Sequence, residues 1–292
     1  MKLALIGGTG LGEALGGETG TAHHPDTPFG KPSAPIIETH WADVPVLILQ
    51  RHGDGHLIRP TAVNSRANLF ALKQLGATHV LASGAVGSLR EEFAPKHLLV
   101  PDQIIDKTSA RATTFYENAA VHVEFADPFS GPLRQLLLDS ADAVETPTHP
   151  AGCYVCMEGP AFSTKAESHM HRLWGGDVIG MTAMPEARLA REAELPYALV
   201  ALVTDYDCWR THEAHPDGKE GLLREIIGNL QAAAASGVTV LKRAVELAAG
   251  RKDQLMADPI RDTLAMAIWS DKSKIPPDEV TRLSPLWGHH FD

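Results

Sequence analysis

Short apolar runs recur along the chain, separated by longer segments whose apolar residues repeat about every 3.6 positions. The short runs are rich in β-branched residues and bounded by turn residues, so they predict buried strands. The predicted strands are Leu3–Ile6, Val46–Leu49, His79–Ala82, His97–Pro101, Tyr154–Met157, Val178–Met181 and Tyr197–Thr204.

Several segments between these runs have a helical pattern instead. Thr164 and Glu167 have the spacing of a capping box, and Pro185 suits a first helical turn. Gly237 is a candidate break in the longest pattern. The predicted helices are Pro60–Gly76, Ser163–Trp174, Pro185–Ala193 and Glu220–Ala249. Strands that alternate with helices predict an α/β single domain, with a central mixed, mainly parallel β-sheet flanked by helices.

Loops and a distinct C-terminal segment complete the pattern. Segments 108–132 and 207–219 are predicted loops, which is where sites are usually built. Beyond residue 250 we expect a helix near Ile260–Trp269 and then a Pro-rich tail, which is either disordered or packed on a neighbouring subunit.

Composition narrows the class of protein. The chain has 292 residues, 44% of them apolar, and a formal net charge of −10. This charge argues against a nucleic-acid partner, but a few local cations and N–H groups still suit a small anionic substrate. No apolar run has the length of a membrane span, and the first one is too short for a signal peptide. Three cysteines, an odd and sparse number, suit a reducing cytoplasm.

Cys153 and Cys156 form a C-x-x-C pair, which raises the possibility of redox or metal chemistry. They fall on a predicted strand, where positions three apart point to opposite faces. No second such pair completes a zinc set, so we expect neither a disulfide nor metal ligands there.

Four places that follow apolar runs offer groups for an anion. Gly7, Gly8 and Gly10 surround Thr9 in a turn that fits an anion site and a plain tight turn equally well, and that completes neither a P-loop nor a dinucleotide fingerprint. Arg51 and His52 follow the second run. They are interpreted either as a clamp on phosphate or as part of a surface ion pair. The segments Ser83–Ser88 and Gly180–Glu186 add backbone N–H groups and a threonine before a helix. Because ligands gather at the carboxyl ends of strands, the set predicts a phosphate site made of Thr9, Arg51, Gly84, Ala85 and Thr182.

Asp205 and Asp207 follow the last apolar run, two positions apart and so on one face of a strand. Carboxylates beside an apolar strand tend to have a raised pKa and can hold a proton. A protonated acid can donate to a purine nitrogen and stabilise the base as a leaving group. A metal pair or a loop cap is the alternative; it is weaker because no third acidic ligand is close in sequence.

A series of further motifs runs in order through residues 2–245. They are Ile6–Leu11, Thr27–Ser33, Arg51–Gly53, Val63-Asn64 with Ala67-Asn68, Gly87–Glu92, Glu158–Pro160 with Phe162, Ala166–Ser168, Met181-Thr182 and Thr204–Trp209. Together they resemble the trimeric purine nucleoside phosphorylase family, and within it the 5′-methylthioadenosine phosphorylase branch.

The resemblance implies an activity and a site. The reaction is phosphorolysis of S-methyl-5′-thioadenosine to adenine and 5-methylthioribose 1-phosphate, with inorganic phosphate as co-substrate and no cofactor or metal. Residues 1–250 form the phosphorylase domain, and 251–292 a helix and tail that contribute to the 5′ pocket or to subunit contact. The implied assembly is a homotrimer or a dimer of trimers, in which His122 reaches the next subunit's 5′ pocket. The implied phosphate site is Thr9, Arg51, His52, Gly84, Ala85 and Thr182; Asp205 and Asp207 are the catalytic acids; and the substrate-binding residues are Phe162, Ser163, Met181, His122 and His56.

The resemblance also bears on the base. Hypoxanthine and guanine phosphorylases of the family have asparagine where Asp205 is and glutamate where Ser163 is. A 6-amino group needs an acceptor, which a carboxylate provides, so adenine is favoured. The family often has threonine where Gly84 stands, for which Ser83 is a candidate substitute, and this branch usually has arginine where Ala161 stands. Rival functions are a methylthioinosine or inosine/guanosine phosphorylase, a hydrolytic nucleosidase, and a non-catalytic nucleoside-binding protein.

Overall fold

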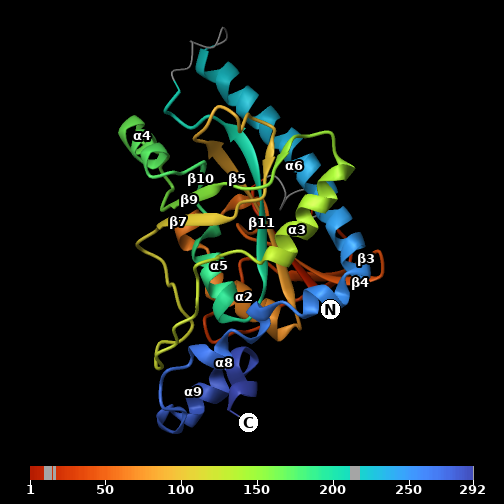
Figure 1. Cartoon of the computed structure of the whole chain (residues 1–292), viewed down its shortest axis with the longest axis vertical. Coiled ribbons are helices and arrows are strands. Elements are labelled where there is room, and N and C mark those ends of the chain that lie inside the picture. Colours follow the sequence, from red (N-terminus) through yellow and green to blue (C-terminus); the bar gives the residue numbers. More distant parts are fainter. Residues whose placement is uncertain (10–14, 16–17, 211–217, 292) are drawn as a thin grey trace.

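The computed structural model describes residues 1–9, 15, 18–210 and 218–291, so Gly10 of the predicted turn and 211–217 of the second predicted loop lie outside it. In the described part an 11-stranded mixed sheet forms the centre of an α/β fold (Figure 1). The strands are β1 Leu3–Gly7, β2 Thr21–His23, β3 Ile36–Trp41, β4 Val44–Gln50, β5 His79–Ser88, β6 Leu98–Leu99, β7 Gln103–Lys107, β8 Thr148–His149, β9 Cys153–Met157, β10 Val178–Gly180 and β11 Tyr197–Asp205.

The order of the strands brings their carboxyl ends together. The sheet runs β2-β3-β4-β1-β5-β10-β9-β7, while β11 pairs with both β5 and β6, and β6 with β8. Strands β4, β1, β5 and β11 are parallel neighbours, whereas β10 pairs antiparallel with the last residues of β5. The residues that follow β1, β4 and β11 therefore emerge at one edge, as predicted for an open α/β sheet.

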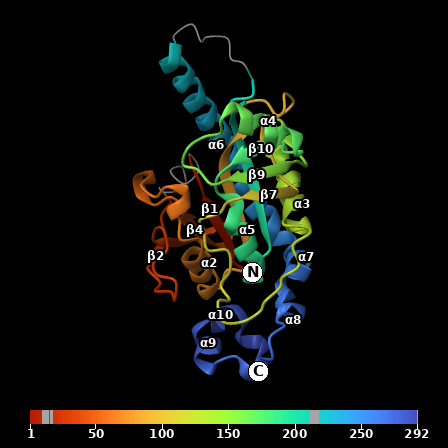
Figure 2. The ribbon, with the colours of Figure 1, turned by 90° about the vertical axis from the view of Figure 1, so that its left-hand side faces the viewer.

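Helices cover both faces of the sheet (Figures 1 and 2). Alternate residues of β1 enter two separate cores: Ala4 and Ile6 pack towards one face, Leu3 and Leu5 towards the other. Burial on both faces explains why β1 and β11 are continuous apolar runs without alternation. The helices are α2 Ser65–Gln74, α3 Gly131–Asp139, α4 Lys165–Leu173, α5 Ala183–Glu192, α6 Gly218–Gly250, α7 Lys252–Met256, α8 Leu264–Ala267, α9 Pro277–Arg282 and α10 Ser284–Trp287.

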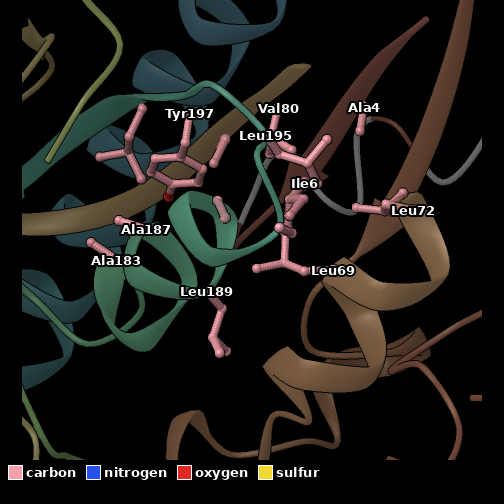
Figure 3. Packing of buried hydrophobic residues seen from close by; sticks show 14 of the residues in the cluster. Ala4, Ile6, Leu69, Leu72, Val80, Ala183, Ala187, Leu189, Leu195 and Tyr197 are labelled. Carbon is pink, nitrogen blue, oxygen red and sulfur yellow. The ribbon is translucent and has the colours of Figure 1, made fainter. Parts of the chain in front are cut away.

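One core lies between the sheet and the helices α2 and α5 (Figure 3). Ile6 of β1 and Leu69 of α2 are fully or almost fully buried there, beside Leu195, which lies two residues before β11. The opposite core is covered by α3 and α6, through Leu137, Leu241 and others. Both cores continue under the carboxyl edge of the sheet, so the loops of that edge rest on a rigid base.

All seven predicted strands are present, and the helix starts at Thr164 and near Pro185 are confirmed. Thr164 and Glu167 form the predicted capping box. The prediction that β5 ends near Ala82 was wrong: the strand continues to Ser88 because β11 and β10 pair with its second half. Gly237 does not break α6, in which it is buried. The short strands β2, β3, β7 and β8 were not predicted, since their burial is partial and their apolar pattern correspondingly weak.

The C-terminal segment folds onto its own chain, so the alternative of a disordered tail was wrong, while a contact with a neighbouring subunit stays a prediction. The predicted helix Ile260–Trp269 is a 3₁₀ turn at Pro259–Asp262 followed by the short α8. Trp287 is fully buried, and its ring stacks on Tyr116 at 4.7 Å between centroids. This segment lies at the end of the molecule away from α4 (Figure 1). No helix in the described part of the chain is long and apolar enough to cross a membrane.

Two glycines make a matched test of packing. A Cβ at Gly180 in β10 would lie 1.9 Å from the buried hydroxyl oxygen of Tyr154, whereas a Cβ at Gly228 in α6 would meet no atom within 4 Å. We expect Gly180→Ala to lower the free energy of unfolding by about 1–3 kcal/mol through overpacking. Gly228→Ala should raise it by about 0.4–1 kcal/mol by restricting the unfolded chain. Denaturant titration at equal protein concentration measures both, and equal values for the two variants would contradict this packing.

Candidate functional site

A cavity of about 380 Å³ opens at the carboxyl edge of the sheet. Its walls come from the ends of β1, β4, β10 and β11, from the middle of β5, and from the first half of α6. Most of the predicted site residues are among its lining, namely Thr9, Arg51, His52, His56, Gly84, Ala85, Phe162, Met181, Thr182, Asp205 and Asp207.

Arg51 is fixed at one end of the cavity by a buried ion pair. Its Nε and Nη2 donate to the two carboxylate oxygens of Glu186 in α5, each at 2.8 Å, and Nη1 donates to the carbonyl of Ser83 at 2.8 Å. Burial alone would lower the pKa of Arg51, but the Glu186 carboxylate outweighs it and keeps the guanidinium charged. The predicted alternative of a surface ion pair was wrong, since both side chains are almost fully buried.

Glu186, which orients Arg51, is a residue of the candidate site that the sequence did not single out. Its Oε1 also accepts a hydrogen bond from the hydroxyl of Tyr197 at 2.9 Å. Glu186 lies 135 residues from Arg51, so only the fold brings the pair together. A Cβ on Gly8 would lie 2.5 Å from Nη1 of Arg51, which is why the chain needs glycine there.

His52 lies beside Arg51 as a neutral ring. Its Nδ1 is 2.8 Å from the carbonyl of Ile58, which fixes Nδ1 as the protonated nitrogen, and the ring stacks on His56 at 4.2 Å between centroids. Burial, together with the nearby Arg51, lowers the pKa of His52 to about 4. Its Nε2 is therefore an acceptor and suits a protonated phosphate oxygen.

Gly84 and Ala85 line the cavity from mid-strand, not from a strand end as predicted. Thr182 reaches their level because β10 runs antiparallel back along β5. A Cβ on Gly84 would lie 3.2 Å from Oγ1 of Thr182, so a threonine at this position would press on Thr182. Ser83 is fully buried and its Oγ accepts from the N–H of Gly8 at 3.4 Å, so its side chain is not at the cavity wall.

Asp205 and Asp207 lie at the other end of the cavity. Asp205 ends β11, but Asp207 lies beyond the strand with φ of 46°, so the predicted reason for their shared face was wrong although both face the cavity. The N–H of Asp207 donates to Oδ1 of Asp205 at 2.7 Å, and Oγ1 of Thr204 donates to Oδ2 at 2.6 Å. Ser168 in α4 donates its hydroxyl to Oδ2 of Asp207 at 2.5 Å.

The other predicted substrate residues divide into two groups. Phe162 and Met181 line the cavity, and Phe162 is 84% exposed at its rim. Ser163 and His122 are not among the described lining residues. The hydroxyl of Ser163 faces the sulfur of Met157 at 3.8 Å, and the ring of His122 packs on Trp269 at 4.6 Å.

Arg111 is a second residue that sequence reasoning missed. Its guanidinium donates to the carbonyls of Met181, Met184 and Glu158, each at 2.6 Å, and to the carboxylate of Glu158 at 2.9 Å. Burial alone would raise the pKa of Glu158, but the N–H groups of Ser109 and Ala110 and the guanidinium lower it to about 2. Arg111 thus holds the backbone that carries Met181 against the loop that leads to His122. It was inconspicuous in the sequence because its acceptors are main-chain carbonyls.

None of the three cysteines is among the described residues that line the cavity. Cys153, Cys156 and Cys208 are free thiols, and the first two lie on β9 as predicted. Burial raises the pKa of Cys156 to about 12, so it is an inert core thiol.

Comparisons with known proteins agree with this geometry. The sequence pattern of the phosphorylase superfamily matches residues 2–246. The chain is 42% identical over 290 residues to the S-methyl-5′-thioadenosine phosphorylase of Geobacter sulfurreducens, covering 99% of this chain and 98% of that one. It is 46% identical over 220 residues to the protein of the same name in Xenopus tropicalis, covering 73% and 78%.

Solved structures of similar fold are also known. A methylthioadenosine phosphorylase sourced from an antarctic soil metagenomic library superposes with a TM-score of 0.87 at 39% identity, covering 97% of this chain and 98% of that one. A methylthioadenosine phosphorylase from Schistosoma mansoni in complex with adenine gives 0.84 at 34% identity, covering 92% and 99%.

The chain therefore belongs to the phosphorylase superfamily, and it is an enzyme of the purine nucleoside phosphorylase type. Within that class it is similar, over nearly its whole length, to the methylthioadenosine phosphorylases, as the sequence motifs predicted.

The neutral state of His52 predicts a pH dependence of stability. Its pKa lies near 4 in the folded chain, below the ordinary value of 6.5, so the unfolded chain binds the proton first as the pH falls. The contribution of neutral His52 to the free energy of unfolding is complete above pH 6.5 and is lost as the pH falls towards 4. His52→Gln should therefore lose less of its unfolding free energy than the parent protein over this interval. The exposed His24→Gln is the matched control, and identical slopes for His52→Gln and the parent would contradict the neutral ring.

Proposed function

We propose that this protein cleaves S-methyl-5′-thioadenosine with inorganic phosphate, giving adenine and 5-methylthioribose 1-phosphate. One observation carries the proposal: a single cavity holds a fixed arginine at one end and a pair of carboxylates at the other. The named relatives, similar over nearly the whole chain, support the same reaction.

The arginine end suits phosphate. Arg51 supplies a charge that is already oriented by Glu186, so little reorganisation accompanies binding. Thr9 and Thr182 supply hydroxyl groups, and Gly84 and Ala85 leave the backbone open to a bulky anion. The Nε2 atom of neutral His52 accepts a hydrogen bond from the hydroxyl group of a singly protonated phosphate. Held in this way, a phosphate oxygen attacks C1′ as the bond from C1′ to N9 breaks.

The carboxylate end suits the purine. Electrons of the broken bond pass into the base, and a proton carried by Asp205 neutralises it at N7, so that adenine leaves uncharged. Asp207 accepts a hydrogen bond from the 6-amino group, while Ser168 fixes its other side. Phe162 flanks the base and Met181 lies along the ribose. His56 lines the cavity beside His52, and the small side chain of Ser163 leaves room near the base. The free thiols support a reducing compartment, the cytoplasm.

A homotrimer, alone or paired into a dimer of trimers, would complete the 5′ pocket with His122 of the adjacent subunit. His122 N–H donates to the carbonyl of Ala267, and Trp269 N–H donates to that of Ala120, so the C-terminal segment holds this loop. Trp269 is 71% exposed and Met266 86% exposed beside it, as expected of a surface that another subunit covers. We propose that residues 251–292 act as this support, appended to the phosphorylase domain of 1–250.

The test of the reaction is a phosphate-dependence assay on methylthioadenosine, with detection of free adenine. Turnover should need phosphate and should be faster than on methylthioinosine or inosine. Asp205→Asn should lower kcat by about 10²–10⁴-fold, since it removes the proton donor. Turnover without phosphate would indicate a hydrolase, faster turnover of inosine an oxopurine phosphorylase, and binding without product a nucleoside-binding protein; each would overturn the proposal.

The shared pocket predicts complementation between two defective variants. His122→Ala impairs the pocket of the adjacent subunit, whereas Asp205→Asn impairs the pocket of the subunit that carries it. An oligomer made of either variant alone should therefore be slow on methylthioadenosine. Mixed oligomers, made by co-expression, should regain activity, because a His122→Ala subunit beside an Asp205→Asn subunit forms an intact pocket. Light scattering should give three or six times the chain mass of 31.4 kDa. A monomer, or no recovery on mixing, would contradict the shared pocket.

A further inference from the structure

Three potential metal ligands meet outside the cavity lining. The two carboxylate oxygens of Glu194 lie 2.9 Å from Nε2 of His290 and 3.0 Å from Nε2 of His289. One ligand atom from each of the three residues falls within 4.8 Å of the others. Glu194 lies between α5 and β11, whereas the histidines are three residues or fewer from the C-terminus. None of the three lines the cavity, so the proposed reaction leaves them unexplained.

The cluster is held in place by its surroundings. The side chain of Glu194 is 1% exposed, and its Oε1 accepts a hydrogen bond from the N–H of Leu264 at 2.9 Å. Lys272 donates to the carbonyl of His290 at 2.6 Å, which fixes the backbone of the tail. The side chain of His290 is 8% exposed and that of His289 53%, so one side of the cluster stays open to solvent. A metal ion that approached the cluster would meet a carboxylate already held in place and could enter from the side on which His289 is exposed.

We propose that Glu194, His289 and His290 bind a divalent transition metal ion, Zn²⁺ in the first instance. Two imidazoles and one carboxylate are a typical set for Zn²⁺, and imidazole is a poor ligand for Ca²⁺ or Mg²⁺. Bonds of about 2.0–2.2 Å to the three groups require a small outward movement of the two rings. The open side leaves a fourth position for water.

The ion has a structural role. It joins the last residues of the chain to the turn before β11, across about 95 positions of sequence. Between these anchors lie Trp287, buried against Tyr116, and the segment that holds the His122 loop. A metal that binds only the folded chain therefore stabilises this whole C-terminal segment.

The experiment is a Zn²⁺ titration by calorimetry on untagged full-length protein, first dialysed against a chelator. We expect one Zn²⁺ bound per chain in the parent. The control variant His24→Ala, which replaces an exposed histidine outside the cluster, should bind the same amount. Affinity should fall by more than about 100-fold in His289→Ala, because even outer-shell changes cost up to that much. His289 is the safer variant since its ring is half exposed, so its loss does not endanger the fold.

Two further measurements separate this site from other histidines. Zn²⁺ should raise the Tm of the parent and of His24→Ala by several degrees and leave that of His289→Ala unchanged. Co²⁺ should give visible ligand-field bands that are lost in His289→Ala and in His290→Ala. Absence of binding in the parent, or unchanged affinity in His289→Ala, would overturn the proposal and show that the rings only donate hydrogen bonds to Glu194. None of these readings depends on phosphorylase activity.

Discussion

The buried pair of Arg51 and Glu186 is the interaction on which the site depends. A guanidinium without a counter-charge would be very costly in this interior, and replacing either partner leaves the other uncompensated. The pair joins the residue after β4 to helix α5, and its further hydrogen bonds reach Ser83 in β5 and Tyr197 in β11. Three parts of the sheet are thus fixed around one guanidinium, so its position and orientation at this end of the cavity are set before any ligand arrives.

The sequence predicted the seven well-buried strands and most of the residues that line the cavity, because these depend on local patterns. Apolar runs at β1 and β11 marked buried strands, and the residues just after them became cavity walls. What it missed depends on contacts between distant segments: Glu186 meets Arg51 across 135 positions, and Arg111 recognises carbonyls that no residue type reveals. The long β5 was misread for the same reason, since its glycines resemble a turn until β10 pairs with them.

The C-terminal segment shows a similar limit. Its prolines and glycine, read alone, left open a disordered tail, yet Trp287 packs beside Tyr116 and the last histidines lie against Glu194. These contacts make the tail part of the same cooperative structure as the loop 108–132. The loop in turn is tied through Arg111 to the backbone of Met181. A change near the C-terminus can therefore reach the cavity without touching it.

Strand β5 sets the distance between the two ends of the cavity. Gly84 lies beside Thr182 at one end, and Gly87 lies beside Asp205 and Asp207 at the other. Three residues of extended backbone span roughly 10 Å, and no rotamer change can alter that span. If phosphate and purine bind as proposed, the main chain of β5 rather than side chains sets the distance between them. Under the proposed function, substitutions of side chains around the cavity would change the preference for the base or the 5′ group, while the distance between the two ends would stay the same.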